Sequence, residues 1–405
     1  MDMEIICAYR PKKPEWDTIA IKFIKRSRRI WTVGDAKYMK IMYLLFSFTI
    51  GGAERLVVDI CNENAKRNNV VFLYIINDLY DKELLKTLDS SVVVICKNRV
   101  VGSNGKVFEL LDICRFCRKN KIDIVHCNAF NTPELLGVTK FFCKNIRIVH
   151  TIHGVNQFRG ISKFRILYRN FVCDSIIAIS ESVKNDIIAA GIKKEKISVV
   201  YNAIILEKFT RINTVRKKWL SGQIVIGNVA RIDYHNKGQD ILIDAVSALK
   251  DYYDINCLFA GGVDEKHKGE LDELRERAEK AVAGTKSEII FMGNINDIPN
   301  FLEKIDIFVL PSRHEGFGIS LVEAMKMNIP CIASDLNGPK EIIGDNERGI
   351  LFKTGKVTDL VAKIIMVIDN YAECVERSDR AVKYIDANFD ITKMADRLEQ
   401  IYRGD

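Results

Sequence analysis

The chain contains a stretch from Val309 to Met325 that reads Val-Leu-Pro-Ser-Arg-His-Glu-Gly-Phe-Gly-Ile-Ser-Leu-Val-Glu-Ala-Met. An apolar, strand-like run ends at Pro311, and a loop with two glycines opens a helix at about Gly318. Exposed N–H groups and the positive end of a helix dipole form an anion site, and glycines let a phosphate approach the backbone. The stretch therefore predicts a strand–loop–helix junction that binds an anionic ligand, although a plain junction with surface glutamates is the alternative.

Strand-like and helix-like runs alternate on both sides of this junction. A first series starts at the apolar run of residues 41–48, and a second starts at residues 224–229. Such alternation predicts βαβ units and parallel sheets. We expect two doubly wound, Rossmann-like α/β domains, residues 39–203 and 204–405, with the last helix packing back on the N-terminal domain. Ligands of such sheets bind beyond the carboxyl ends of the strands, so we expect the site in a central cleft that both domains face.

Composition places the chain among globular proteins. It has 405 residues, of which 48% are hydrophobic, and eleven cysteines scattered mostly in apolar runs. An odd, scattered set predicts reduced thiols and a cytoplasmic location. Cys114 and Cys117 form a C-x-x-C in a helical run, and no second Cys or His pair follows at zinc spacing. This favours a plain helix surface over a metal or redox site. We find no apolar run of about 18–20 residues and no signal peptide.

The charge is unevenly distributed. Counted over Lys, Arg, Asp and Glu, residues 1–38 carry +4, residues 39–203 carry +9 and residues 204–405 carry −5. Two interpretations stay open for the basic half: it faces an anionic partner, such as the inner membrane surface, or it has only solvated helix faces. Residues 1–38 form an extension that is either a basic amphipathic membrane-surface helix or poorly ordered. Nucleic-acid binding is not expected, because the C-terminal half is acidic.

Two further motifs concern the anionic ligand. Arg231 follows the strand of residues 224–229, and Lys237 opens the next helix together with Gly238. Two cations at this point are placed to neutralise a diphosphate. A second glycine turn, Gly51-Gly52, follows the first strand of the N-terminal series.

Together these motifs resemble a family 4 glycosyltransferase of the GT-B fold. The resemblance covers residues 39–405 and rests on Glu315 and Glu323 within an E-G-F-G…E-A pattern, on Arg231 with Lys237-Gly238, and on Gly51-Gly52. A Ser-x-x-x-Lys pattern starting at Ser180 and leading to Asn202 also fits. The family commonly has Asn-Gly at that last position, whereas this chain has Asn202-Ala203.

The resemblance implies metal-independent transfer from a nucleoside diphosphate sugar, with retention, to a glycan or lipid-linked acceptor in polysaccharide synthesis. It implies no cofactor besides the nucleotide sugar as co-substrate. It assigns His153 and Glu315 to the reacting sugar, and the cations to the leaving diphosphate. The donor-binding residues that it implies are Gly51, Gly52, Arg231, Lys237, Gly293, Asn294, Ile295, Gly316, Phe317, Gly318, Ile319 and Glu323.

Other functions on the same fold stay open. A nucleotide-sugar epimerase or a phosphorylase would keep the donor site, and a non-catalytic subunit would bind the sugar nucleotide without transfer. A dinucleotide-dependent dehydrogenase is not expected, because no strand is followed by G-x-G-x-x-G.

Overall fold

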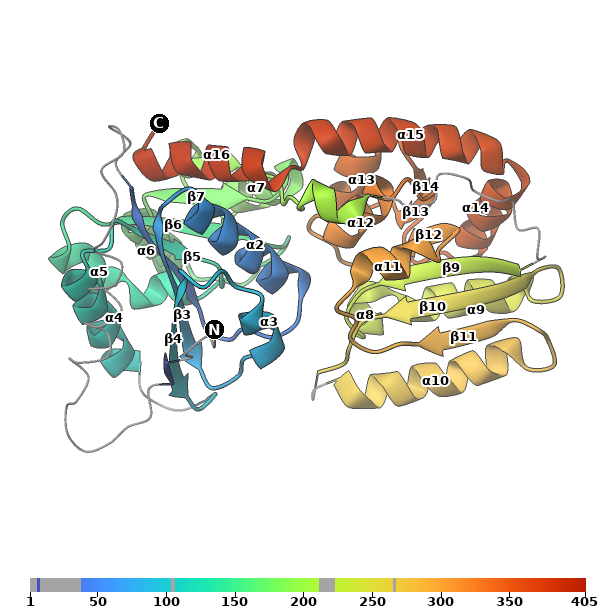
Figure 1. Cartoon of the computed structure of the whole chain (residues 1–405), viewed down its shortest axis with the longest axis horizontal. Helices are drawn as coiled ribbons and strands as arrows, with labels where there is room; N and C mark the ends of the chain where they lie inside the picture. The colour runs from blue at the N-terminus through green and yellow to red at the C-terminus, as the bar shows by residue number, and fades with distance from the viewer. Residues whose placement is uncertain (1–5, 8–37, 103–105, 211–222, 265–266) are drawn as a thin grey trace. The chain divides into compact units, whose positions relative to one another are not determined.

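The computed structural model describes residues 6–7, 38–102, 106–210, 223–264 and 267–405. The described chain divides into two compact units: a first of Met1–Thr49 and Cys61–Ile148, and a second of Ile50–Ile60 and Val149–Asp405. Figure 1 shows the elements along the chain. Of the predicted extension, the structure describes only Tyr38 and a short edge strand, and the predicted amphipathic helix lies outside the described residues.

The first sheet has eight strands in the order β1-β4-β3-β2-β5-β6-β7-β8, and the pairings from β1 to β5 and from β6 to β8 are parallel. Its strands are β1 Ile6–Cys7, β2 Lys40–Leu45, β3 Val70–Asn77, β4 Val93–Arg99, β5 Ile124–Cys127, β6 Arg147–Ile152, β7 Ser175–Ala178 and β8 Ile197–Val199. The helices that alternate with them are α2 Gly52–Lys66, α3 Lys82–Lys86, α4 Lys106–Asn120, α5 Gly137–Phe142, α6 Lys163–Val172 and α7 Glu181–Ala189.

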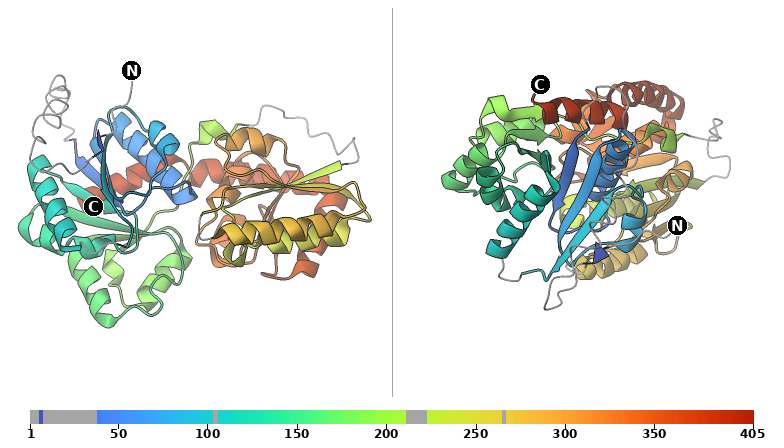
Figure 2. Two further views of the ribbon diagram at one scale, coloured as in Figure 1. Left: turned by 90° about the horizontal axis from the view of Figure 1, so that it is seen from below. Right: turned by 60° about the vertical axis from the view of Figure 1, so that its left-hand side comes forward.

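The second sheet has six parallel strands in the order β11-β10-β9-β12-β13-β14. These are β9 Gln223–Val229, β10 Asp254–Ala260, β11 Glu288–Phe291, β12 Ile307–Leu310, β13 Cys331–Ser334 and β14 Ile350–Phe352. Its helices are α8 Tyr234–Lys237, α9 Gln239–Leu249, α10 Lys268–Val282, α11 Ile298–Glu303, α12 Ile319–Lys326, α13 Asn337–Ile343, α14 Val357–Asp369, α15 Tyr371–Asn388 and α16 Ile391–Arg403. Figure 2 shows α10, in gold, running along the strands of this sheet.

Central strands of both sheets are apolar because their side chains are buried on both faces. Strand β12 is buried along its whole length, and strand β2 is buried at five of its six positions. Continuous apolar runs of this kind are typical of parallel sheets covered by helices. The prediction of two parallel α/β sheets is therefore confirmed.

The order of the second sheet determines where a ligand can bind. Strands β9 and β12 are adjacent, yet the chain leaves β9 towards β10 and leaves β12 towards β13. This reversal is a topological switch point, and the loops after both strands start at the same edge. The glycine turn follows β12 and Arg231 follows β9, so the fold brings these two motifs together.

The cysteines fit the prediction of reduced thiols. The ten cysteines from Cys61 to Cys374 are free, and all of these but Cys143 are buried. Cys114 and Cys117 lie on helix α4 as expected, but on its buried face rather than on its surface, because that face packs inward. Among the described residues, no helix combines the length and the apolar character needed to span a bilayer.

Candidate active site

The glycine turn after β12 has the backbone conformation that its sequence predicts. Gly318 caps helix α12 with φ 102° and ψ 63°, in the left-handed region that favours glycine. A Cβ at this position would also lie 3.2 Å from the side chain of Leu310. Helix α12 has no side-chain N-cap, so its first N–H groups and its positive dipole end are available to an anionic ligand.

Gly316 lies in a second close approach of backbone segments. Its carbonyl oxygen accepts a hydrogen bond of 3.0 Å from the Ser180 hydroxyl. A Cβ on Gly316 would lie 2.8 Å from the carbonyl oxygen of His153. Only glycine therefore fits here, and the predicted residue His153 is brought directly against the turn.

His153 follows strand β6 and has a buried imidazole ring. Neither ring nitrogen has a hydrogen-bond partner among the described residues. Burial lowers the pKa of His153 to about 4, so the ring is neutral at neutral pH. Buried ring nitrogens without a partner are costly, which is typical of a group that bonds a ligand. The neighbouring His150 lies within β6 and is fully buried, as a strand residue should be.

Lys237 and Glu315 form an ion pair beside the turn. The Lys237 ammonium lies 2.9 Å from the Glu315 carboxylate, and their side chains are 25% and 15% exposed. Lys237 ends α8, a short helix capped by Asp233, and Gly238 follows with φ 67°. A Cβ at Gly238 would overlap the carbonyl of Pro311, so this glycine permits the lysine to approach the turn.

Arg231 is a more loosely held cation. Its side chain is 51% exposed and lies 3.8 Å from Asp233 and 3.9 Å from Asp264. Its carbonyl accepts a hydrogen bond of 2.9 Å from the Gln239 amide, which fixes the backbone without engaging the guanidinium. An exposed guanidinium with only long ion pairs can reorient to a diphosphate.

The predicted base-binding segment Gly293-Asn294-Ile295 follows strand β11. Gly293 has φ 68°, and its carbonyl accepts a hydrogen bond of 2.8 Å from the Gly261 N–H. The Ile295 carbonyl accepts a hydrogen bond of 2.7 Å from the Arg55 guanidinium. Arg55 was not predicted as a site residue: it directly follows Gly51-Gly52-Ala53-Glu54, but how far its side chain reaches is not readable from the sequence.

Glu323 lies on the second turn of α12 and is partly buried. Burial raises its pKa to about 7, while the nearby Arg55 acts in the opposite direction. We find no hydrogen bond to its carboxylate within the described chain. A carboxylate that is enclosed and not yet hydrogen-bonded can accept both hydroxyls of a ribose.

Two predicted donor residues have side chains that are occupied by packing. Phe317 is buried and its ring lies 5.9 Å from that of Tyr201 and 5.5 Å from that of Phe389, so only its backbone can meet a ligand. Ile319 contacts the other glycine turn: a Cβ on Gly52 would lie 2.9 Å from the Ile319 methyl group. Gly51 faces the carboxylate of Glu54, whose pKa is raised by burial.

Comparisons with known proteins identify the family of this chain. Residues 211–386 match the family model described as Glycosyl transferases group 1, and residues 50–208 match Glycosyltransferase Family 4. The chain belongs to the group 1/family 4 glycosyltransferases. As a glycosyltransferase it is an enzyme, and the predicted family is confirmed.

Relatives of this glycosyltransferase include enzymes of bacterial glycan synthesis. It is 27% identical to the lipopolysaccharide core biosynthesis mannosyltransferase LpsB of Rhizobium meliloti over 64% of this chain and 72% of the relative. It is 25% identical to the UDP-Gal:alpha-D-GlcNAc-diphosphoundecaprenol alpha-1,3-galactosyltransferase of Escherichia coli, over 77% and 82% of the two chains. The Anabaena HepE structure with UDP and glucose matches with a TM-score of 0.77 and 21% identity, over 90% of this chain and 99% of that one. This structural likeness confirms the GT-B fold.

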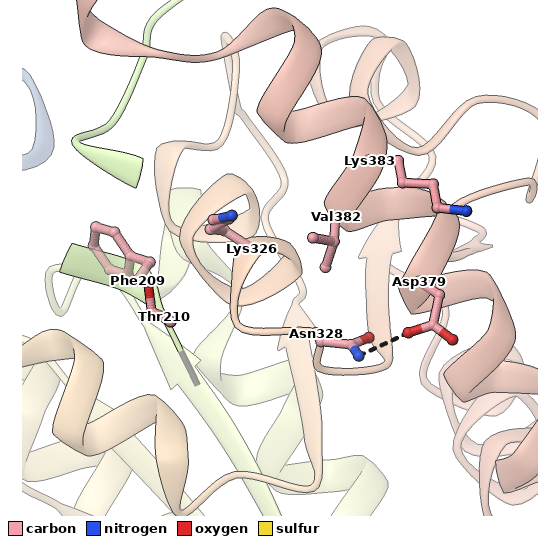
Figure 3. A pocket seen from close by; sticks show the side chains of 7 residues that line it. All are labelled: Phe209, Thr210, Lys326, Asn328, Asp379, Val382 and Lys383. Atoms are coloured by element: carbon pink, nitrogen blue, oxygen red, sulfur yellow. Dashed lines mark hydrogen bonds between the residues drawn. The ribbon is translucent and has the colours of Figure 1, made fainter. Parts of the chain in front are cut away.

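The glycosyltransferase has two other features: a cluster of possible metal ligands beside Arg231, and a hollow away from the predicted site residues. Asp233, His267 and Glu270 bring possible metal-ligand atoms within 4.8 Å of one another, although Asp233 also caps α8. Figure 3 shows a hollow at the far end of α12, where Asn328 donates a hydrogen bond of 2.8 Å to Asp379. None of the predicted site residues lines this hollow.

Proposed function

We propose that this glycosyltransferase moves a sugar from a nucleoside diphosphate sugar to a glycan or lipid-linked acceptor, with retention of the anomeric configuration. The observation that carries the proposal is the Lys237–Glu315 pair at 2.9 Å, placed beside the uncapped helix α12. It puts a cation for a phosphate and a carboxylate for sugar hydroxyls at one anion-binding turn.

In the proposed reaction, the bond between the anomeric carbon and the diphosphate oxygen breaks. The acceptor hydroxyl oxygen bonds to that carbon from the same face, and its proton passes to the released diphosphate. Negative charge develops on the diphosphate, so Arg231, Lys237 and the N–H groups of Gly318 and Ile319 stabilise the transition state. The buried, neutral His153 donates a hydrogen bond to the donor sugar and helps to order the acceptor.

The remaining predicted residues hold the rest of the donor. Glu323 accepts hydrogen bonds from the ribose hydroxyls, and the backbone of Gly293, Asn294 and Ile295 borders the base. Gly51 and Gly52 allow a phosphate to approach α2. Two of the similar proteins support the donor and acceptor classes by name: HepE was solved with UDP and glucose, and the Escherichia coli relative acts on a diphosphoundecaprenol-linked sugar.

We also propose the arrangement of the whole protein. Residues 39–203 form the acceptor-side domain and residues 204–405 the donor-side domain, and the enzyme works at the cytoplasmic face of the membrane. We propose that no metal is needed. EDTA should then leave the transfer activity unchanged. If EDTA abolished the activity and a divalent cation restored it, the result would implicate Asp233, His267 and Glu270 as metal ligands.

A panel of nucleotide sugars tests the proposed function. We expect one class of donor to raise the melting temperature of the purified chain, because a ligand that binds only the folded state stabilises it. Lys237→Ala should remove most of this shift. Lys286→Ala is the matched control, since Lys286 is exposed and lies outside the site. A panel without any stabilising donor would contradict the proposal, and donor-dependent epimerisation or phosphorolysis would replace it with an alternative activity.

A further inference from the structure

Helix α6 lies within a part of the chain that has no acidic residue. From Leu135 to Cys173 the sequence contains seven Lys and Arg residues and neither Asp nor Glu. The whole chain holds 53 acidic residues in 405, so a gap of this length marks a local bias. A basic segment without acids favours an anionic partner.

The outer face of α6 is apolar and uncovered. Phe164, Leu167 and Phe171 are 76%, 67% and 64% exposed, and their spacing places them along one side of the helix. The other side is packed into the protein by Ile166, Arg169 and Val172. The described protein therefore covers one side of the helix and leaves the apolar side uncovered.

Cations lie at both ends of α6. Arg159 and Lys163 are exposed and have no ion pair among the residues that the structure describes. At the other end of the helix, the Lys193 N–H donates a hydrogen bond of 3.0 Å to the Asn170 side chain. This bond brings the exposed Lys193 and Lys194 close to the end of α6.

The size of the stripe distinguishes between partners. A helix of ten residues is about 15 Å long. A stable dimer interface needs roughly 800 Å² from each partner, far more than three side chains on one short helix supply. An apolar stripe edged by cations is instead typical of a helix that lies in the interface of an anionic bilayer.

We propose that α6 docks this enzyme on an anionic membrane surface, with Phe164, Leu167 and Phe171 inserted at the headgroup boundary. Arg159 and Lys163 would then contact lipid phosphates. The inference rests on the proposed function, because docking on a membrane would bring the enzyme to a lipid-linked acceptor.

Vesicle flotation of the full chain tests this surface. The probes are phosphatidylcholine vesicles with and without about one-third phosphatidylglycerol, at low and high salt, with inorganic phosphate as a competitor. The variant is Phe164→Gln/Leu167→Gln/Phe171→Gln, since glutamine keeps the helix propensity. The control is Leu79→Gln/Tyr252→Gln, which removes two other exposed apolar side chains.

We expect binding to the anionic vesicles at low salt, and at least tenfold weaker partition of the triple variant, with the control within about twofold of wild type. Arg159→Gln/Lys163→Gln should lower partition by about fivefold for each cation and flatten its salt dependence. Donor-induced thermal stabilisation should stay unchanged in every variant, so a failed donor site and a failed docking surface remain distinguishable.

Four outcomes would overturn the proposal. Wild type could fail to float with anionic vesicles at low salt, or the triple variant could float like wild type. Light scattering could instead show a wild-type dimer that the triple variant loses, which would assign the stripe to a second copy. If millimolar phosphate inhibited transfer in the absence of vesicles, the cations would be assigned to the binding of a free anion.

Discussion

Glu323→Gln should stabilise the free protein while weakening its donor site. Burial raises the pKa of Glu323 from 4.5 to about 7, which means that the folded state disfavours the ionised form. Because the folded-state pKa is the higher one, the folded state binds more protons than the unfolded state between these two values. The free energy of unfolding of the wild type therefore falls as the pH rises from about 4.5 to about 7.

The size of this effect follows from the shift. A difference of about 2.5 pKa units at about 1.36 kcal/mol per unit is about 3 kcal/mol at pH 8. At pH 5 only about 1 kcal/mol of it is present, because pH 5 lies only about half a unit above the unfolded-state pKa of 4.5 and the folded-state carboxyl is still protonated. Glutamine has nearly the same shape and no charge to bury, so the variant escapes this cost.

Urea denaturation at pH 5 and pH 8 measures the effect. We expect the advantage of Glu323→Gln over wild type to grow by about 2 kcal/mol between these pH values. Glu373→Gln is the control, because Glu373 is exposed and should change little. The same variant should lose most of the thermal shift that a nucleotide sugar gives to wild type. Parallel pH profiles for wild type and Glu323→Gln would refute the reasoning.

Three further predictions concern the glycine turn after β12 and the two residues that lie beside it. Gly316→Ala should abolish transfer, because its Cβ would lie 2.8 Å from the His153 carbonyl; Gly269→Ala, where a Cβ meets open space, should keep full activity in the same assay. Lys237→Ala should lower kcat by about 10²-fold or more with the fold intact by circular dichroism, and a loss under threefold would argue against charge stabilisation by Lys237. His153→Ala should lower kcat yet leave the donor Kd within a few-fold. Because burial lowers the His153 pKa to about 4, the wild-type rate between pH 6 and 8 should show no titration of this ring, and an imidazole titration there would contradict the assignment.

The sequence predicted much of the fold because its strands are short apolar runs with clear ends. The predicted run of residues 224–229 corresponds to β9, Gln223–Val229, and the run of residues 41–48 contains five of the six residues of β2, Lys40–Leu45. Helix α6 received no prediction. Its large apolar side chains lie on the exposed face as well as the buried one, so the usual amphipathic contrast is missing.

The site residues were predictable from the sequence where the backbone conformation requires glycine. Gly316 and Gly318 lie where a side chain would collide or strain the chain, and such constraints appear in the sequence as glycines. The Arg55–Ile295 hydrogen bond joins residues 240 positions apart, and no local pattern encodes it. The Lys237–Glu315 pair is intermediate: the sequence supplied both residues, but only the adjacency of β9 and β12 brings them together.

The most direct test of the proposed reaction is the anomeric configuration of the first product. Proton NMR would follow the purified chain with its stabilising nucleotide sugar and a surrogate acceptor. We predict that an α-linked donor gives an α-linked product at the earliest time points, and that Lys237→Ala slows its appearance without changing its configuration. A β-linked first product would contradict retention, and release of diphosphate without any new glycosidic bond would contradict the transfer itself.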